Sequence, residues 1–292
     1  MTKKKDTNTR LAVGKTYKIY IDGKFPRTES GRYYPLKNKD EVIANICLAS
    51  RKDTREAVVA ARKAFRGWSG FSAFLRGQIL YRIAEMLEGR SEQFVAELVA
   101  LGVSKAKAKT EVAVSIDRLV YYAGWTDKYQ QVFSSVNPVS SSHFNFTVPE
   151  PTGVVTIISP EESGLLGLVS NIAAAIAGGN TCVVLASYTK PLVAISFTEV
   201  LHASDVPAGV VNVLTGSRRE LTEQFSSHMD VNAIIYCDGD ATVDREIQLH
   251  AANNIKRVIR RTGTNWNAKT AQGPYFIRDT QEFKTTWHPI GG

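Results

Sequence analysis

The chain has 292 residues, enough for a large core and about two domains, and its 43% hydrophobic and 22% charged residues are typical of a globular protein. The first ten residues are polar and basic with no apolar stretch behind them, which argues against a secretory signal. No segment is apolar for long enough to cross a bilayer. We therefore expect a cytoplasmic protein without a membrane span.

The formal net charge is +8, and four of the positive charges lie in the first ten residues, within the leader that we assign to residues 1–15. A second basic run, Lys105, Lys107 and Lys109, lacks the interleaved aromatic side chains that stack on bases. A solvated helix face explains this run better than a nucleic-acid site. The sequence therefore predicts no nucleic-acid partner.

The cysteines cannot form a disulfide framework, and none has a neighbouring Cys or His at metal-ligand spacing. We expect buried or half-buried thiols and no metal site, the cysteines being Cys47, Cys182 and Cys237.

The opening section alternates strand-like runs with turns, at residues 18–21, 32–36 and 42–48, with Asp22-Gly23 as a hairpin signal. This pattern predicts a small antiparallel sheet. A helix should follow, with Asp53 as its cap and Glu56 completing a capping box. Helical periodicity continues over residues 75–87, 91–101 and 110–129.

A polar stretch at residues 137–142 and an exposed strand at 144–148 precede a boundary near Pro151. Apolar strands then alternate with segments of helical length, a pattern that predicts a doubly wound parallel sheet of five strands between two helical layers. The predicted strands are 153–159, 181–186, 210–214, 233–237 and 256–260, and the predicted helices are 164–177, 192–204, 219–228 and 243–253. Such sheets bind ligands at the carboxyl ends of their strands, but the fingerprint G-x-G-x-x-G is absent, so the pattern leaves a nucleotide site open.

Three segments resemble the aldehyde dehydrogenase superfamily. YIDGKF, at 20–25, resembles the amino-terminal hairpin of that family, and residues 149–185, with EPTGVVTIISPEESGLLGLVSNIAAAIAGGNTCVVL, resemble its strand-helix-strand entry to the cofactor domain. DVPAGVVNVLTGSRREL, at 205–221, is similar to its next strand and glycine turn. The resemblance implies a Rossmann-like sheet.

More narrowly, four short motifs resemble the incomplete, non-catalytic second unit of the two-unit sixteenth aldehyde dehydrogenase family: Pro-Glu-Glu at 160–162, TDKY at 126–129, NIKRV at 254–258 and the closing KTTWHPIGG. The resemblance implies five parts: a basic leader (1–15), an N-terminal hairpin with helices (16–136), an oligomerisation hairpin (137–150), the Rossmann-like sheet (151–270) and a C-terminal oligomerisation strand (271–292). The catalytic domain that follows the sheet in the family has no room after Arg260.

Catalysis in this family needs a thiolate, an oxyanion hole and a general base. None of the cysteines matches the nucleophile. Glu162 falls on the position of the oxyanion Asn, where a carboxylate cannot donate a hydrogen bond, and Arg260 falls on that of the base, where it cannot accept a proton. The resemblance thus implies an inactive chain with no catalytic residues.

The same comparison with the family implies that cofactor binding is impaired. Ala186 replaces the ribose-binding Lys, and Asp238-Gly239 followed by Asp240 replaces the phosphate turn, which brings carboxylates to a pyrophosphate site. Gly216 and Gly239 leave space for a ligand. We expect no cofactor, with NAD as the alternative; if NAD does bind, its contacts would be Ser159, Pro160, Gly216, Tyr236 and Gly239.

The last segment looks like the carboxy-terminal strand of the family, which joins the oligomerisation hairpin. We expect Phe144 to Val148 and Lys284 to Trp287 to be strands available for pairing with another subunit, in a homo-oligomer or on a full-length aldehyde dehydrogenase. Two alternatives remain: the tail covers only the chain's own sheet edge, or the chain is an NAD-binding component of an aldehyde-oxidising complex.

Overall fold

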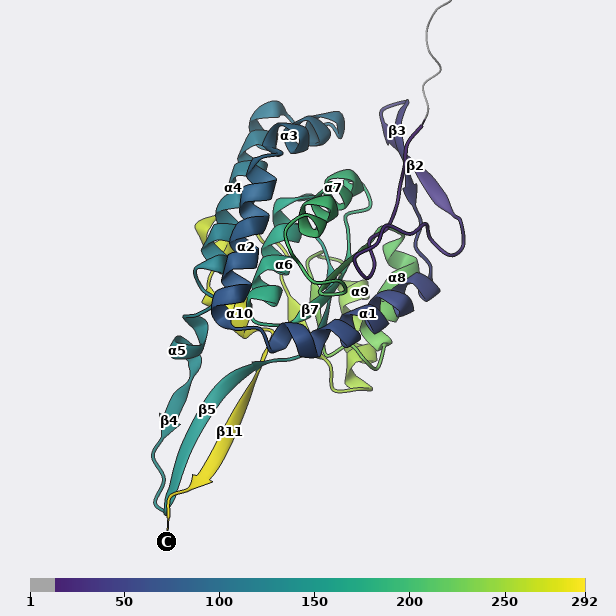
Figure 1. Cartoon of the computed structure of the whole chain (residues 1–292). Helices are drawn as coiled ribbons and strands as arrows, with labels where there is room; N and C mark the ends of the chain where they lie inside the picture. The colour runs from purple at the N-terminus through teal and green to yellow at the C-terminus, as the bar shows by residue number, and fades with distance from the viewer. Residues whose placement is uncertain (1–13, 292) are drawn as a thin grey trace, which may run out of the picture.

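The computed structural model describes residues 14–291, and its centre is a parallel five-stranded sheet with helices on both faces (Figure 1). The strand order is β10-β9-β6-β7-β8. This confirms the predicted fold class. The strands are β6 (Val154–Ile158), β7 (Thr181–Leu185), β8 (Val211–Leu214), β9 (Ala233–Tyr236) and β10 (Arg257–Arg260).

Alternate residues of β6 enter two separate cores, because successive side chains of a strand point to opposite faces. Val155 and Ile157 pack with α6 (Leu166–Ala177) and α7 (Pro191–His202). Val154 and Ile158 pack in the core that also receives α1 (Arg51–Ser69), α8 (Arg218–Ser227) and α9 (Ala241–Ala252). Each face of the sheet is thus covered by helices, as the continuous apolar strands predict.

A group of N-terminal helices extends the first core: α2 (Ala73–Glu88), α3 (Ser91–Ala100), α4 (Lys105–Ala123) and α5 (Tyr129–Phe133). The helix expected over 110–129 is α4, which ends at Ala123, and the residues between α4 and α5 form turns. α4 begins earlier because the hydroxyl of Ser104 accepts from the backbone N–H of Lys107, and Gly124 is its C-cap. The expected cap of α1 was also wrong. Ser50 is the N-cap, and Asp53 completes the capping box by accepting from the N–H of Ser50 at 2.7 Å.

The N-terminal sheet is mixed, whereas the sequence predicted an antiparallel one. β2 (Tyr33–Asn38) and β3 (Glu41–Cys47) are antiparallel, but β1 (Thr16–Tyr17) runs parallel to β3. Residues 18–21 form single bridges and no strand. The Asp22-Gly23 turn is present, with both residues at positive φ, as a tight hairpin turn requires. Most of the expected leader, residues 1–13, lies outside the described part.

A three-stranded sheet with the order β11-β5-β4 projects from the body as an arm (Figure 1). Its strands are β4 (Ser135–Asn137), β5 (His143–Pro151) and β11 (Gln281–Pro289), the last preceded by a 3-10 turn (Lys269–Ala271) and α10 (Pro274–Arg278). All nine residues of β11 pair with β5. The two segments expected to meet another subunit therefore pair with each other.

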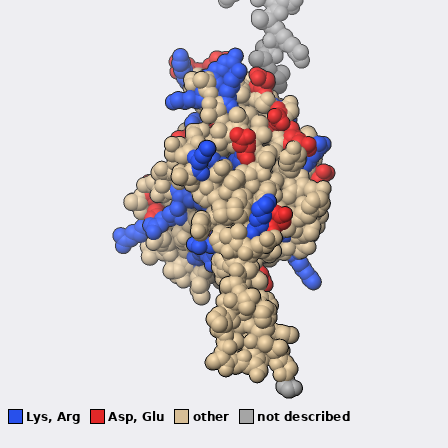
Figure 2. Space-filling view, turned by 90° about the vertical axis from the view of Figure 1, so that its left-hand side faces the viewer, with Lys and Arg blue, Asp and Glu red and all other residues tan. Residues whose placement is uncertain are grey.

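The distal part of the arm carries no Asp, Glu, Lys or Arg, at residues 134–149 and 285–291, and Figure 2 shows it as an uncharged projection below a charged body. Lys284 and Glu150 form an ion pair where the charged surface begins. Among the helices of residues 14–291, none is long and apolar enough to span a bilayer.

Candidate functional site

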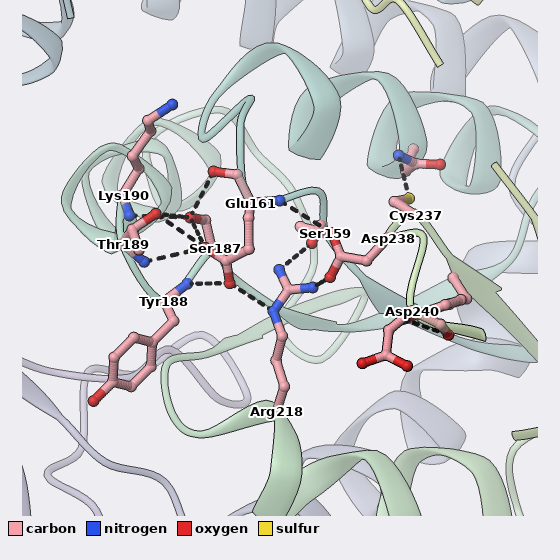
Figure 3. A network of polar contacts seen from close by, with 12 residues as sticks. Ser159, Glu161, Ser187, Tyr188, Thr189, Lys190, Arg218, Cys237, Asp238 and Asp240 are labelled. Atoms are coloured by element: carbon pink, nitrogen blue, oxygen red, sulfur yellow. Dashed lines mark hydrogen bonds and ion pairs between the residues drawn. The ribbon is translucent and has the colours of Figure 1, made fainter. Parts of the chain in front are cut away.

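The crevice at the carboxyl ends of β6 and β9 is the position where a doubly wound sheet normally holds a ligand. Chain connections leave β6 toward β7 and β8 on one side and reach β9 and β10 on the other. Strands that diverge in this way leave a space between their ends. Ser159 and Glu161 follow β6 there, and Asp238 follows β9 (Figure 3).

Arg218, at the start of α8, crosses this crevice. Its Nε lies 2.6 Å from Oε1 of Glu161, and its guanidinium also contacts the carboxylate of Asp238 and donates to the carbonyl of Ser159. The backbone N–H of Glu161 donates to Oδ1 of Asp238 at 3.2 Å. The side chains of Arg218 and Asp238 are both less than a fifth exposed, so solvent screens this ion pair only weakly. The ends of the two strands are therefore tied together from within the chain.

The carboxylate of Glu161 gathers donors from the loop after β7. It accepts from Oγ of Ser187 at 2.8 Å and from the backbone N–H groups of Tyr188 and Thr189 at 3.0 and 3.2 Å (Figure 3). Burial acts to raise the pKa of Glu161, but the charge of Arg218 and these hydrogen bonds outweigh it and hold the pKa below its ordinary value. Glu161 is thus ionised at neutral pH.

Two further carboxylates cap helices at or beside the same edge. Oδ1 of Asp240 accepts from the N–H groups of the second and third residues of α9, at 2.9 and 3.3 Å. Oε1 of Glu111, from α4, accepts from the N–H groups of Leu165 and Leu166 at the start of α6, at 3.0 and 3.2 Å. Backbone N–H groups that would attract an anionic ligand are therefore already bound to carboxylates of the chain.

The residues expected to contact a cofactor are only partly accessible. Ser159, Pro160 and Tyr236 are buried, and Oγ of Ser159 has no hydrogen-bond partner in the described structure. Gly239 faces open space. Gly216 does not leave the expected room, because a side chain there would come within 3.2 Å of the backbone nitrogen of Ala49, which packs against it.

Glu162 and Arg260, the residues at the expected oxyanion and base positions, lie outside the Arg218 cluster. Glu162 is exposed, and only its backbone carbonyl is engaged, by the ammonium of Lys190. Arg260 is exposed and pairs with Asp244 at 3.2 Å. Of the two neighbouring glutamates, Glu161 is thus the one that enters the crevice.

All three cysteines are buried and free, as expected. Burial raises the pKa of Cys237 to about 12, and its sulfur accepts a 3.5 Å hydrogen bond from Nδ2 of Asn171. Burial also raises the pKa of Cys182. Neither thiol supplies a thiolate at neutral pH. Residues 14–291 hold no cluster of His, Cys, Asp and Glu suited to a metal ion.

A cavity of about 720 Å³ opens beside the crevice, between α8 and α9. Ile158, Tyr236 and Val243 give it an apolar part, and Arg218 and Asp238 are among its charged lining residues. This cavity has room for a small organic ligand, next to the ion-pair cluster.

Sequence reasoning drew attention to Asp238 and Asp240 but missed Arg218, Glu161 and Ser187 as partners. The available signal was that two acidic residues, Glu161 and Asp238, come shortly after β6 and β9, and that a basic residue, Arg218, begins α8. That signal shows which charges reach one edge of the sheet, but it does not show which of them meet.

The model of the aldehyde dehydrogenase family matches residues 27–268, and the chain belongs to this family. It is 33% identical over 262 residues to the cytosolic 10-formyltetrahydrofolate dehydrogenase of Mus musculus, covering 87% of this chain and 29% of that protein. It is also 33% identical to the putative aldehyde dehydrogenase DhaS of Bacillus subtilis, covering 85% of this chain and 50% of that one.

Among solved structures, the NAD+ complex of an aldehyde dehydrogenase from Bacillus cereus matches with a TM-score of 0.80 and 27% identity, over 85% of this chain and 51% of that one. The chain thus spans about half the length of DhaS and of this structure, and less of the longer relative. The narrower resemblance to the sixteenth family stays a prediction.

Proposed function

We propose that this chain is a non-catalytic member of the aldehyde dehydrogenase family that acts by assembling with another chain of the same fold through its arm. The observation that carries the proposal is the outer edge of β11. Within the described residues β11 pairs with β5 alone, so the backbone groups along its other side are free to receive a strand.

The surface of the arm supports this role. Trp287 is 58% exposed and Phe144 is 44% exposed, whereas aromatic side chains of this size are usually more deeply buried. The distal part of the arm also lacks the charges that usually protect a sheet edge from pairing, and at its base Lys284 is paired with Glu150. An added strand would cover these groups without burying a charge.

The residues available for the three catalytic roles of the family support the proposed lack of catalysis. The buried thiols of Cys182 and Cys237 supply no thiolate, a carboxylate stands at the expected oxyanion position, and a guanidinium stands at that of the base. An assay with NAD and a panel of short aldehydes should therefore give no NADH. Turnover by the purified chain would contradict this part of the proposal.

Assembly is tested by sedimentation equilibrium of the chain alone and mixed with a full-length aldehyde dehydrogenase of the same organism. Trp287→Lys places a charge on the arm and should weaken association at least about tenfold. Tyr33→Lys changes an aromatic residue of equal exposure on β2 and serves as the matched control. A chain that stays monomeric and joins no full-length enzyme would refute the assembly role.

A second candidate function is an NAD-binding component of an aldehyde-oxidising complex. The cavity between α8 and α9 and the similarity to a structure solved with NAD+ favour it. Calorimetric titration with NAD separates the two functions, because binding at micromolar NAD would support this second one. The expected cytoplasmic location stays a prediction.

A further inference from the structure

We infer that Arg218 and its carboxylate partners are the chain's own substitute for an anionic ligand, and that they close the crevice to dinucleotides and other phosphate compounds. The inference does not depend on assembly through the arm. It concerns the edge of the sheet where this fold normally presents cationic and N–H groups to a phosphate.

The backbone N–H groups at this edge of the sheet are already occupied by carboxylates of the chain. The N–H groups of Tyr188 and Thr189 are bound to Glu161. The N–H groups of the second and third residues of α9 are bound to Asp240, and those of Leu165 and Leu166 at the start of α6 are bound to Glu111. A phosphate would have to displace these carboxylates. Each is held by at least two hydrogen bonds within the chain, so displacement loses contacts that already exist.

The balance of charge at this edge of the sheet also disfavours a phosphate. Arg218 contacts the carboxylates of both Glu161 and Asp238, so one positive charge faces two negative ones. A pyrophosphate at the strand ends would add negative charge beside Asp238 and Asp240, where the guanidinium of Arg218 is already engaged by two carboxylates. The residues present therefore do not fit the pyrophosphate of NAD.

Neutralising the two carboxylates would leave Arg218 in the crevice without a charged partner. Arg218 is held with its guanidinium in the crevice by the carbonyl of Ser159 as well as by the two carboxylates. If Glu161 and Asp238 lose their charge, this guanidinium becomes a fork-shaped donor for an anion. A closed crevice would become an anion site without any change of fold.

The test is calorimetric titration of the full chain with sodium pyrophosphate and, separately, with NAD. The unmodified chain should bind neither at about 1 mM. The variant Glu161→Gln with Asp238→Asn should bind pyrophosphate at least about tenfold more tightly than the unmodified chain, and adding Arg218→Met should abolish that gain.

The matched control is Glu223→Gln with Glu246→Gln, which removes two carboxylates from the neighbouring cavity and leaves the contacts of Arg218 in place. It should give no gain in affinity. Circular dichroism checks that each variant is folded, and if the double variant does not fold, Asp238→Asn alone makes the same test. Binding of pyrophosphate by the unmodified chain, no gain in a folded variant, or an equal gain in the control would each overturn the inference.

Discussion

Arg218 holds together the ends of two strands that are far apart in the sequence, so its removal should affect stability as well as ligand binding. Arg218→Met leaves Glu161 and Asp238 close together without a cation, and we expect a loss of about 2 kcal/mol in the free energy of unfolding near pH 7. Chemical denaturation measures this loss. Arg219→Met, one residue along and exposed, should change it by less than about 0.5 kcal/mol.

The same pair gives a pH dependence with a definite sign. The pKa of Glu161 in the folded chain lies below its ordinary value of 4.5. Its contribution to the free energy of unfolding is therefore present above pH 4.5 and is lost as the pH falls. The difference between the unmodified chain and Arg218→Met should therefore shrink below about pH 4.5. A difference that stays constant into acid would show that Glu161 does not carry the effect.

Lys256 makes a second titration measurable. Its side chain is buried, its ammonium donates to the carbonyl of His228 at 2.8 Å, and burial lowers its pKa from 10.5 to about 8. Between pH 8 and about 9.5, Lys256 keeps its proton in the unfolded chain but loses it in the folded chain. The free energy of unfolding should therefore rise with pH over this range, by about 1–2 kcal/mol. Lys256→Met should abolish this rise. An unchanged slope in the variant would contradict the assignment.

At the scale of elements, Asn180 joins the sheet to the arm. Its side chain accepts from the N–H of Gly153 at 2.9 Å and donates to the carbonyls of Ala175 and Thr280, at 3.3 and 3.0 Å, so it joins the approach to β6, the end of α6 and the approach to β11. Asn180→Ala leaves the buried N–H of Gly153 without its partner and removes one donor from each of the two carbonyls, and it should cost about 2–3 kcal/mol in unfolding free energy. The exposed Asn267→Ala is the control, and equal losses in the two variants would contradict this role.

Most strands and helices of the central sheet could be predicted to within one or two residues, because their apolar runs and periodicity are local properties. The errors lie where a side chain outside the periodic run fixes the end of a helix, as Ser50 does for α1 and Ser104 does for α4. At the candidate site, neighbours in the sequence were separated by the fold. Glu161 turns into the crevice and Glu162 faces solvent, a choice that depends on Arg218 and Ser187.

At the scale of the whole molecule, the uncharged distal part of the arm predicts how assembly depends on salt. An interface built from backbone hydrogen bonds and aromatic contacts is not screened, so association measured by sedimentation equilibrium should change by less than about threefold between roughly 50 and 500 mM salt. Association through the charged body would weaken as salt rises, and that result would locate the interface away from the arm.

The sequence by itself determined the alternation of strands and helices, the parallel sheet and the family, because periodicity and motifs are carried by neighbouring residues. It also placed the arm segments as strands. Only the tertiary structure decided that β11 pairs with β5 and that Arg218 meets Glu161 and Asp238. These contacts join residues 20 or more positions apart, and they depend on how the chain crosses from one strand to the next. The packing of Ala49 against Gly216 was decided in the same way.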